Sequence, residues 1–118
     1  MPESPATIIE NLGDAIVVHV QYHDMTEQHL TEIQTDITNA SAKQNVPLIL
    51  DLAKVKYIPS LALGLFVRIA NSFKSKQQRF ILASPQPTVR QVLAITRLDR
   101  AMEVQDSVDT ALKAVRPG

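Results

Sequence analysis

The sequence has 118 residues, no cysteine and a formal net charge of zero, and 45% of its residues are hydrophobic, which fits one globular domain of ordinary composition. The absence of cysteine excludes disulfides and thiol chemistry and favours a reducing compartment. The first residues lack the basic and apolar segments of a secretory signal, and the most apolar run, Leu61 to Val67, is far too short to span a bilayer. We therefore expect a cytoplasmic protein without membrane insertion.

The charge is unevenly distributed along the chain. Residues 1–59 contain three lysines and eight acids (3 − 8 = −5), whereas residues 60–118 contain nine basic residues and four acids (9 − 4 = +5). Either the two halves neutralise one another across the fold, which is the interpretation we favour, or the second half presents a basic surface to an acidic partner. Aromatic residues make up only 4% of the sequence and no Arg/Lys cluster is present, so nucleic acid is not expected as a partner.

The first part of the chain predicts a hairpin followed by a helix. Two strands, Thr7 to Leu12 and Ala15 to Tyr22, are joined by a Gly-Asp turn, and the second strand alternates regularly between two faces. Asp24 is predicted as the helix N-cap, with Glu27 as its capping-box partner. The helix is expected to end near Lys43, and its apolar stripe consists of Leu30, Ile33, Ile37 and Ala40.

The middle of the chain predicts a buried strand, a loop and a second helix. The apolar run Val46 to Leu50 is too short for a helix and indicates a central strand buried on both faces. Asp51 follows as a structural turn residue, whose carboxylate is expected to accept backbone N–H bonds from its own turn. An exposed loop then leads to Ser60, the predicted N-cap. The helix runs from Leu61 to about Lys76, with an apolar stripe made by Ala62, Leu65, Phe66, Ile69, Ala70 and Phe73.

The last part of the chain predicts two short strands and two helices. Arg79 to Ala83 indicates a buried strand, and Pro87 fits the first turn of a helix. A small strand, Met102 to Val104, follows. Asp106 or Ser107 is expected to cap the last helix, whose inward residues are Val108, Ala111, Leu112 and Val115.

The predicted order of elements is β-β-α-β-α-β-α-β-α. This order is typical of an α/β protein with a central mixed β-sheet of about four to five strands, packed by four helices. No repeat or low-complexity linker divides the chain, so we expect a single domain over residues 1–118, with frayed ends at residues 1–5 and 116–118.

No arrangement of residues predicts catalysis. In an extended strand, His19 and His23 would lie roughly 13 Å apart, too far for one metal ion, and His29 has no carboxylate-rich companion. A Ser–His–Asp set is not supported, because the second half of the chain contains no histidine, and none of the three glycines belongs to a phosphate-binding loop. Asp51 resembles the phospho-acceptor of a receiver domain, but the acidic pair and the lysine that such a domain needs do not match. We therefore expect no enzyme activity, no cofactor and no metal.

The chain resembles the STAS domain, especially the single-domain anti-sigma-factor antagonists of bacteria. The resemblance covers nearly the whole chain and is carried by Leu48 to Ile58, Leu63-Gly64-Leu65, Arg79 to Ala83, Pro87 to Leu93 and Val108 to Leu112. It implies the STAS fold and a partner-switching protein that binds an anti-sigma factor or serine protein kinase and frees a sigma factor, thereby controlling transcription. In many members of the family the partner switches this off by phosphorylating a Ser or Thr in the loop before the second helix.

The switch motif of the family, Asp-Ser-Ser/Thr-Gly-Leu-Gly, corresponds to residues 59–64. The last two residues set the register, but Pro59 replaces Asp, Leu61 occupies the usual acceptor position and Ala62 replaces Gly. Leucine has no hydroxyl group, so phosphorylation at that position is chemically excluded.

Three interpretations of this loop follow. In the first, which we favour because the acid expected beside the acceptor is missing, the protein is permanently unmodified and an exposed Leu61 adds an apolar anchor to a partner-binding surface. In the second, the neighbouring Ser60 takes the phosphate, adding about −1.5 to −2 charges at a helix N-terminus. In the third, Leu61 turns inward as a core residue and the surface is used differently.

The resemblance places the partner-binding surface on this loop and on the outer face of the following helix. The expected contact residues are Pro59, Ser60, Leu61, Ala62 and Gly64, with Arg68, Asn71 and Lys74 added as rim contacts because they lie off the apolar stripe of the helix. An alternative function is that of a STAS subunit in a stressosome-type scaffold or a lipid-transport complex, and a small-ligand or nucleotide binder is a third. Homodimerisation is left open.

Overall fold

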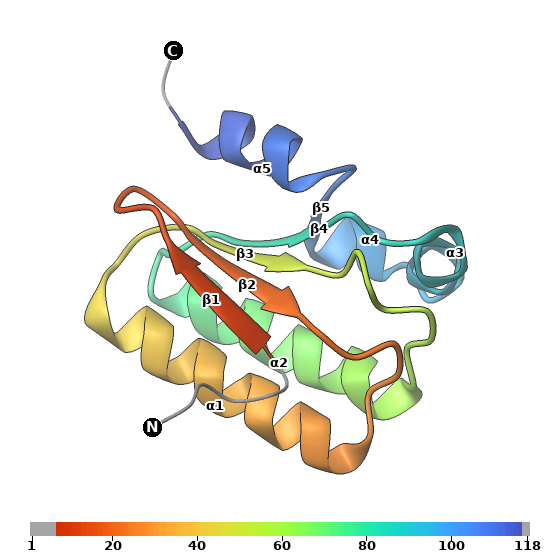
Figure 1. Cartoon of the computed structure of the whole chain (residues 1–118). Coiled ribbons are helices and arrows are strands. Elements are labelled where there is room, and N and C mark those ends of the chain that lie inside the picture. Colours follow the sequence, from red (N-terminus) through yellow and green to blue (C-terminus); the bar gives the residue numbers. More distant parts are fainter. Residues whose placement is uncertain (1–6, 117–118) are drawn as a thin grey trace.

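The computed structural model describes residues 7–116, which form five strands and five helices around one sheet (Figure 1). The strands are β1 (Thr7–Asn11), β2 (Ile16–Val20), β3 (Leu48–Asp51), β4 (Phe80–Ala83) and β5 (Glu103–Gln105). The helices are α1 (Glu27–Lys43), α2 (Ser60–Ser75), α3 (Pro87–Ile95), α4 (Leu98–Ala101) and α5 (Val108–Val115). The predicted mixed α/β fold class and the positions of its main elements are confirmed.

Helix α4 is not among the predicted elements, so the described part of the chain has five helices where four are expected. The helix is four residues long, and none of its residues is buried. It begins after Arg97, whose backbone is in the left-handed region (φ 61°). A single turn without an apolar stripe leaves no periodic signal in the sequence, which explains why it was missed.

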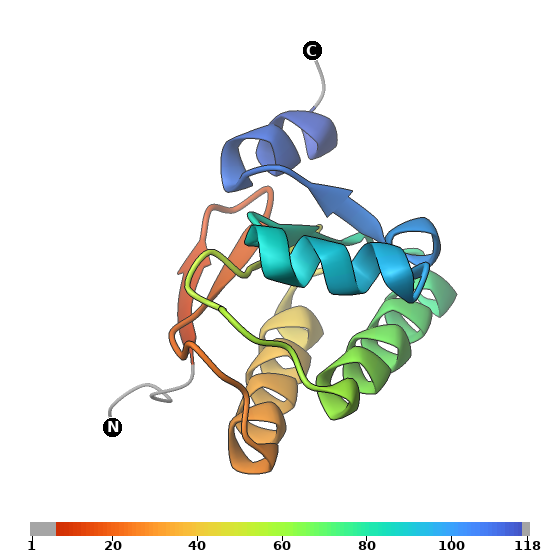
Figure 2. The same cartoon turned by 90° about the vertical axis from the view of Figure 1, so that its right-hand side faces the viewer.

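The sheet has the strand order β1-β2-β3-β4-β5. Strands β1 and β2 pair antiparallel, whereas β2, β3, β4 and β5 pair parallel to their neighbours. Helices α1 and α2 lie below the sheet and α5 lies above it in the view of Figure 1. Figure 2 brings α3 to the front, between α5 and α2. The sheet is therefore the middle layer, with helices on both faces.

Strand β3 lies at the centre of this sheet and is buried on both faces. The described residues form two hydrophobic cores, a large one between the sheet and helices α1 and α2 and a small one between the sheet and α5. Leu48 and Leu50 belong to the large core, whereas Ile49 belongs to the small core. All three are fully buried. A strand covered on both faces needs an uninterrupted apolar run, and burying each such side chain contributes about 1.5–3 kcal/mol.

The apolar stripes of the two long helices close the large core. The predicted stripe of α1 is buried along its whole length. The stripe of α2 is buried except at Ala70, which is half-buried. Since these residues recur at helical spacing, the opposite face of α2 is left to solvent.

Helix α1 begins later than predicted. Its N-cap is Thr26, whose Oγ1 accepts a hydrogen bond from the His29 N–H (3.2 Å), so the predicted capping box at Asp24 is wrong. Met25, just before the cap, and Leu30, one turn into the helix, are both buried in the large core. This is the arrangement of a hydrophobic staple, which favours the residue directly after Met25 as the cap.

The caps of two further helices are also defined. The N-cap of α2 is Pro59, with extended backbone and no side-chain cap bond. Ser60 is therefore the first helical residue, and its prediction as the N-cap is wrong. For α5, the cap is Ser107 rather than Asp106, because the Ser107 Oγ accepts a hydrogen bond from the Thr110 N–H (3.0 Å).

Three arginine–carboxylate pairs show how part of the charge is arranged. They are Arg79–Glu103, Arg90–Asp106 and Arg116–Asp14. Of these three, only the last joins the two oppositely charged halves, and its hydrogen bond lowers the pKa of Asp14. Of the ends predicted to be frayed, residues 1–5 and 117–118 lie outside the described residues, whereas Arg116 is described and pairs with Asp14 (2.8 Å). Within residues 7–116, no helix combines the length and the apolar character needed to cross a membrane.

Candidate functional site

Residues 52–59 connect β3 to α2 and are called the β3–α2 loop here. Every third residue points inward, since Leu52, Val55 and Ile58 are buried. The side chains between them, including Lys54 and Tyr57, are exposed. Three apolar anchors therefore hold the loop on the domain while it presents charged and aromatic groups to solvent.

Hydrogen bonds to two other segments tie down the backbone of the β3–α2 loop. The N–H groups of Lys56 and Tyr57 donate to the His23 carbonyl (2.8 and 3.3 Å). From the other side, the Thr88 Oγ1 at the start of α3 donates to the Lys56 carbonyl (2.9 Å). Figure 2 shows the loop passing beside α3. A loop restrained in this way loses little conformational entropy when a partner binds.

Leu61 lies at the start of α2, directly after this loop. Its side chain is 52% exposed, so the interpretation in which Leu61 turns inward as a core residue is wrong. Ser60, the residue before it, is also exposed, and no hydrogen bond engages its side chain within the described residues. Ser60 and Leu61 are thus two adjacent exposed residues at the N-terminus of a sixteen-residue helix.

Ala62, by contrast, is fully buried, so its side chain cannot contact a partner as the sequence-based contact list proposed. The other expected contacts lie on the solvent side of the loop and of α2. Arg68, Asn71 and Lys74 are exposed and Gly64 is half-buried. Because residues three, four and seven apart share a helix face, α2 brings these groups together with Ser60 on its outer side. We call this set, with Pro59 and Leu61, the α2 surface.

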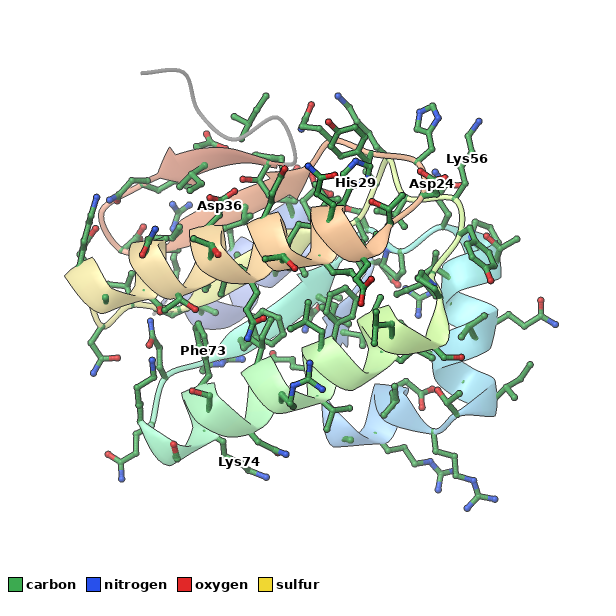
Figure 3. All side chains as sticks on the ribbon, turned by 90° about the horizontal axis from the view of Figure 1, so that it is seen from below. Asp24, His29, Asp36, Lys56, Phe73 and Lys74 are labelled. Carbon is green, nitrogen blue, oxygen red and sulfur yellow. The ribbon has the colours of Figure 1, made fainter. Side chains whose placement is uncertain are left out.

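The two edges of the α2 surface border different elements. Arg68 lines a groove beside α1, whereas Lys74 lines a hollow beside Met102 at the start of β5. Figure 3, which views the domain from the helix side, shows Lys74 on the side of α2 away from α1. The α2 surface is therefore continuous with parts of α1 on one side and with the region around Met102 on the other.

The groove beside α1 has a volume of about 180 Å³ and opens next to Leu61. From α2 it is lined by Leu61, Leu65 and Arg68, and from α1 by Glu27, Leu30, Thr31 and Gln34. The contribution of α1 was missed, because it depends on how the two helices pack. The sequence feature that could have indicated this contribution is the row of polar residues beside the apolar stripe of α1, which includes Glu27, Thr31 and Gln34.

Asp51, at the end of β3, uses its two carboxylate oxygens differently. Oδ1 accepts a hydrogen bond from the Ala53 N–H (3.0 Å), within the turn that was expected for this residue. Oδ2 lies 2.7 Å from His19 Nδ1, and His19 Nε2 lies 3.0 Å from Glu10 Oε1. Sequence reasoning missed this three-residue bridge, because it requires the register that places His19 beside Asp51 on neighbouring strands.

The bridge changes the proton affinity of His19. Partial burial disfavours the charged imidazole, but the hydrogen bonds to Glu10 and Asp51, together with their negative charges, outweigh this and raise the pKa of His19 above its ordinary value. Both ring nitrogens face a carboxylate oxygen, so this geometry favours the imidazolium form, which can donate to both.

The remaining histidines do not form a metal centre. His29 stacks on Tyr22, with ring centroids 3.6 Å apart, and its Nδ1 accepts the Thr26 N–H of the α1 cap. Among residues 7–116, no group of three or more His, Cys, Asp or Glu side chains is arranged to hold a metal ion.

Comparison with known proteins identifies the family. The model of the STAS domain family matches residues 6–111 of the chain. The chain belongs to the STAS domain family. This agrees with the five-stranded mixed sheet, the helices on both of its faces and the β3–α2 loop described above.

Relatives of this STAS domain include proteins of several bacteria. It is 38% identical over 69 residues, 58% of the chain, to a Thermotoga maritima protein that is named as an anti-sigma factor antagonist, and the match spans only 61% of that relative's length.

Among solved structures, an anti-sigma factor antagonist of Thermotoga maritima is 25% identical, with a TM-score of 0.81 over 94% of this chain and 95% of the other. One from Mycobacterium paratuberculosis is also 25% identical, with a TM-score of 0.80 over 99% and 98% of the two chains.

Proposed function

We propose that this STAS domain is an anti-sigma-factor antagonist, a non-catalytic cytoplasmic protein that binds an anti-sigma factor or serine protein kinase and thereby frees a sigma factor. The proposed contact residues are those of the α2 surface: Pro59, Ser60, Leu61, Gly64, Arg68, Asn71 and Lys74. The observation that carries the proposal is the 52% exposure of Leu61, at the end of a loop that is already tied down. The names of the relatives reported above support the assignment of the partner class.

Leu61 is the proposed anchor of the interface. Because Leu61 is half exposed in the free domain, covering it can contribute about half of the roughly 1.5–3 kcal/mol that full burial of a leucine gives. The groove beside α1 opens next to it, so an apolar side chain of the partner would be flanked by Leu65 and Arg68, which line this groove. Interfaces commonly depend on a few such central residues, surrounded by polar contacts.

We further propose that the domain is constitutively competent to bind. The family position that would accept a phosphate is a leucine, and Pro59 supplies no acid beside it. Ser60 is the competing acceptor, since it carries a hydroxyl and is an exposed residue in the first turn of α2. A phosphate there would be tolerated by the helix dipole but would place a double negative charge in the interface.

The test is calorimetric binding to the purified serine-kinase/anti-sigma partner. Leu61→Asp is expected to weaken binding by about 2 kcal/mol, roughly 30-fold, while the melting temperature is retained, because an acid is favourable in the first turn of a helix. Ile95→Asp is the matched control, since Ile95 is 73% exposed on a different helix. Equal affinities for the two variants would show that the α2 surface is not part of the interface.

The alternative assignment, a subunit of a stressosome-type scaffold or a lipid-transport complex, has weaker support. A solved stressosome structure that is 18% identical to this chain has a TM-score of 0.73, and this similarity supports a shared fold alone. Light scattering on the purified protein separates the two functions. A small particle that binds the kinase with a defined stoichiometry is expected, and a large homogeneous particle without kinase binding would favour the scaffold.

A further inference from the structure

We propose that His19, held between Glu10 and Asp51, positions the start of the β3–α2 loop and makes the α2 surface sensitive to pH. The positioning role stands on the geometry of the isolated domain. Only the last step, from the loop to the affinity for a partner, rests on the proposed function.

The first step is the hydrogen-bonding chemistry of the bridge. Both ring nitrogens of His19 face a carboxylate, at 2.7 Å from Asp51 and 3.0 Å from Glu10. A carboxylate is an acceptor only, and a neutral imidazole has a single N–H donor. Both contacts are therefore hydrogen bonds only when His19 is protonated, and loss of the proton removes the donor from one of them.

The second step is the charge around the imidazole. Glu10 approaches from β1 and Asp51 from β3, and Lys54 of the loop lines the same hollow. The Nζ of Lys54 donates to the Gln21 Oε1 (2.9 Å) rather than to either carboxylate. On the same face of the sheet, α5 packs over the other end of the strands, where Arg116 pairs with Asp14. Two anions and one cation thus surround His19, and this balance favours the imidazolium ion.

The third step connects the bridge to the loop. While Oδ2 of Asp51 faces His19, its Oδ1 holds the Ala53 N–H (3.0 Å). The Ala53 carbonyl in turn accepts a hydrogen bond from the Gln86 side chain (2.8 Å). When His19 loses its proton, a single N–H serves two carboxylates, so the hold of His19 on the Asp51 carboxylate weakens and the hydrogen bond from the Ala53 N–H weakens with it. His19 acts on the interface through Asp51 and touches no partner itself.

The positioning role is tested by NMR on the isolated chain. We expect both ring nitrogens of His19 to be protonated at pH 7, and the amide signal of Ala53 to titrate with the same midpoint as the ring. Glu10→Gln is expected to lower that midpoint, and His19→Gln to abolish the titration of the Ala53 amide. His23→Gln is the matched control, because His23 is exposed and its hydrogen bonds to the loop are made by its backbone carbonyl, which the substitution retains. A neutral His19 ring at pH 7, or an Ala53 amide that does not follow it, would overturn the proposal.

The consequence for binding is measured with the purified kinase partner at pH 6.5 and 8.5. Affinity is expected to fall at least about fivefold at the higher pH in the wild type and in His23→Gln, and to be independent of pH in His19→Gln. A flat profile in the wild type, with the NMR coupling present, would refute the control of the interface by His19. Failure to bind the partner at either pH would instead count against the proposed function and leave the NMR result standing.

Discussion

The guanidinium of Arg68 lies over Gly64, with Nη1 3.6 Å from the position that a Cβ on residue 64 would occupy. This distance is an ordinary van der Waals contact, so the added methyl group fits without moving the helix. Glycine inside a helix is less stable than alanine by roughly 0.5–1 kcal/mol. We expect Gly64→Ala to raise the free energy of unfolding by about that amount in a urea titration. A destabilised variant would mean that the Arg68 side chain cannot adjust.

Introducing a hydroxyl at the family's acceptor position should restore phosphorylation. In the presence of the serine kinase and ATP, we expect Leu61→Ser to gain one phosphate by intact mass spectrometry and the wild type to gain none. Ser60→Ala, alone and combined with Leu61→Ser, identifies the acceptor. A phosphate on the wild type that disappears in Ser60→Ala would contradict the constitutive model and assign the switch to Ser60.

The capping box of α1 predicts that Thr26 contributes more to the stability of the protein than Asp24 does. Thr26→Ala removes the side-chain acceptor of the His29 N–H and should lower the free energy of unfolding by about 1 kcal/mol, within a range of roughly 0.5–2. Asp24→Ala, at the residue that sequence analysis named as the cap, should change stability by less than about 0.5 kcal/mol. The reverse order of the two effects would place the start of the helix two residues earlier.

The bridge at His19 also predicts how stability depends on pH. A histidine whose pKa is raised in the folded state stabilises the fold fully below its unfolded pKa, near 6.5, and loses this contribution as the pH rises through the folded value. We therefore expect the stability difference between the wild type and His19→Gln to be largest at pH 6 and to shrink, by on the order of 1 kcal/mol, by pH 9. Urea titrations across this range measure it. A difference that grows with pH would mean that the neutral ring is the stabilising form.

Much of the fold could be predicted because the apolar pattern of the sequence reflects the layers of the structure. The run before Asp51 is continuous because β3 is covered on both faces, and the stripe of α2 recurs every three to four residues because one side of this helix faces the core. The exposure of Leu61 could be anticipated in the same way, since it falls beside that stripe rather than in it. The burial of Ala62 could also have been inferred, as the first residue of the stripe.

Features that depend on contacts between distant segments could not be predicted. The neighbours of His19 follow from the register of three strands, and the groove beside Leu61 follows from the packing of α1 against α2. The choice of Thr26 over Asp24 as a cap depends on Met25 reaching the core. In each of these cases the local residues allow several arrangements, and the tertiary structure selects one.

The spacing of apolar anchors in the β3–α2 loop has a consequence for which of its residues can be substituted. Leu52, Val55 and Ile58 are the buried residues of this loop, and the residues between them are exposed. Substitutions at the exposed positions are therefore expected to change the stability of the fold little. Substitutions at Lys54, Lys56 or Tyr57 are expected to alter the chemistry presented at the edge of the proposed interface at small cost to the stability of the domain. Variants that differ only at these outward positions are therefore expected to keep the architecture of the domain while presenting a different surface.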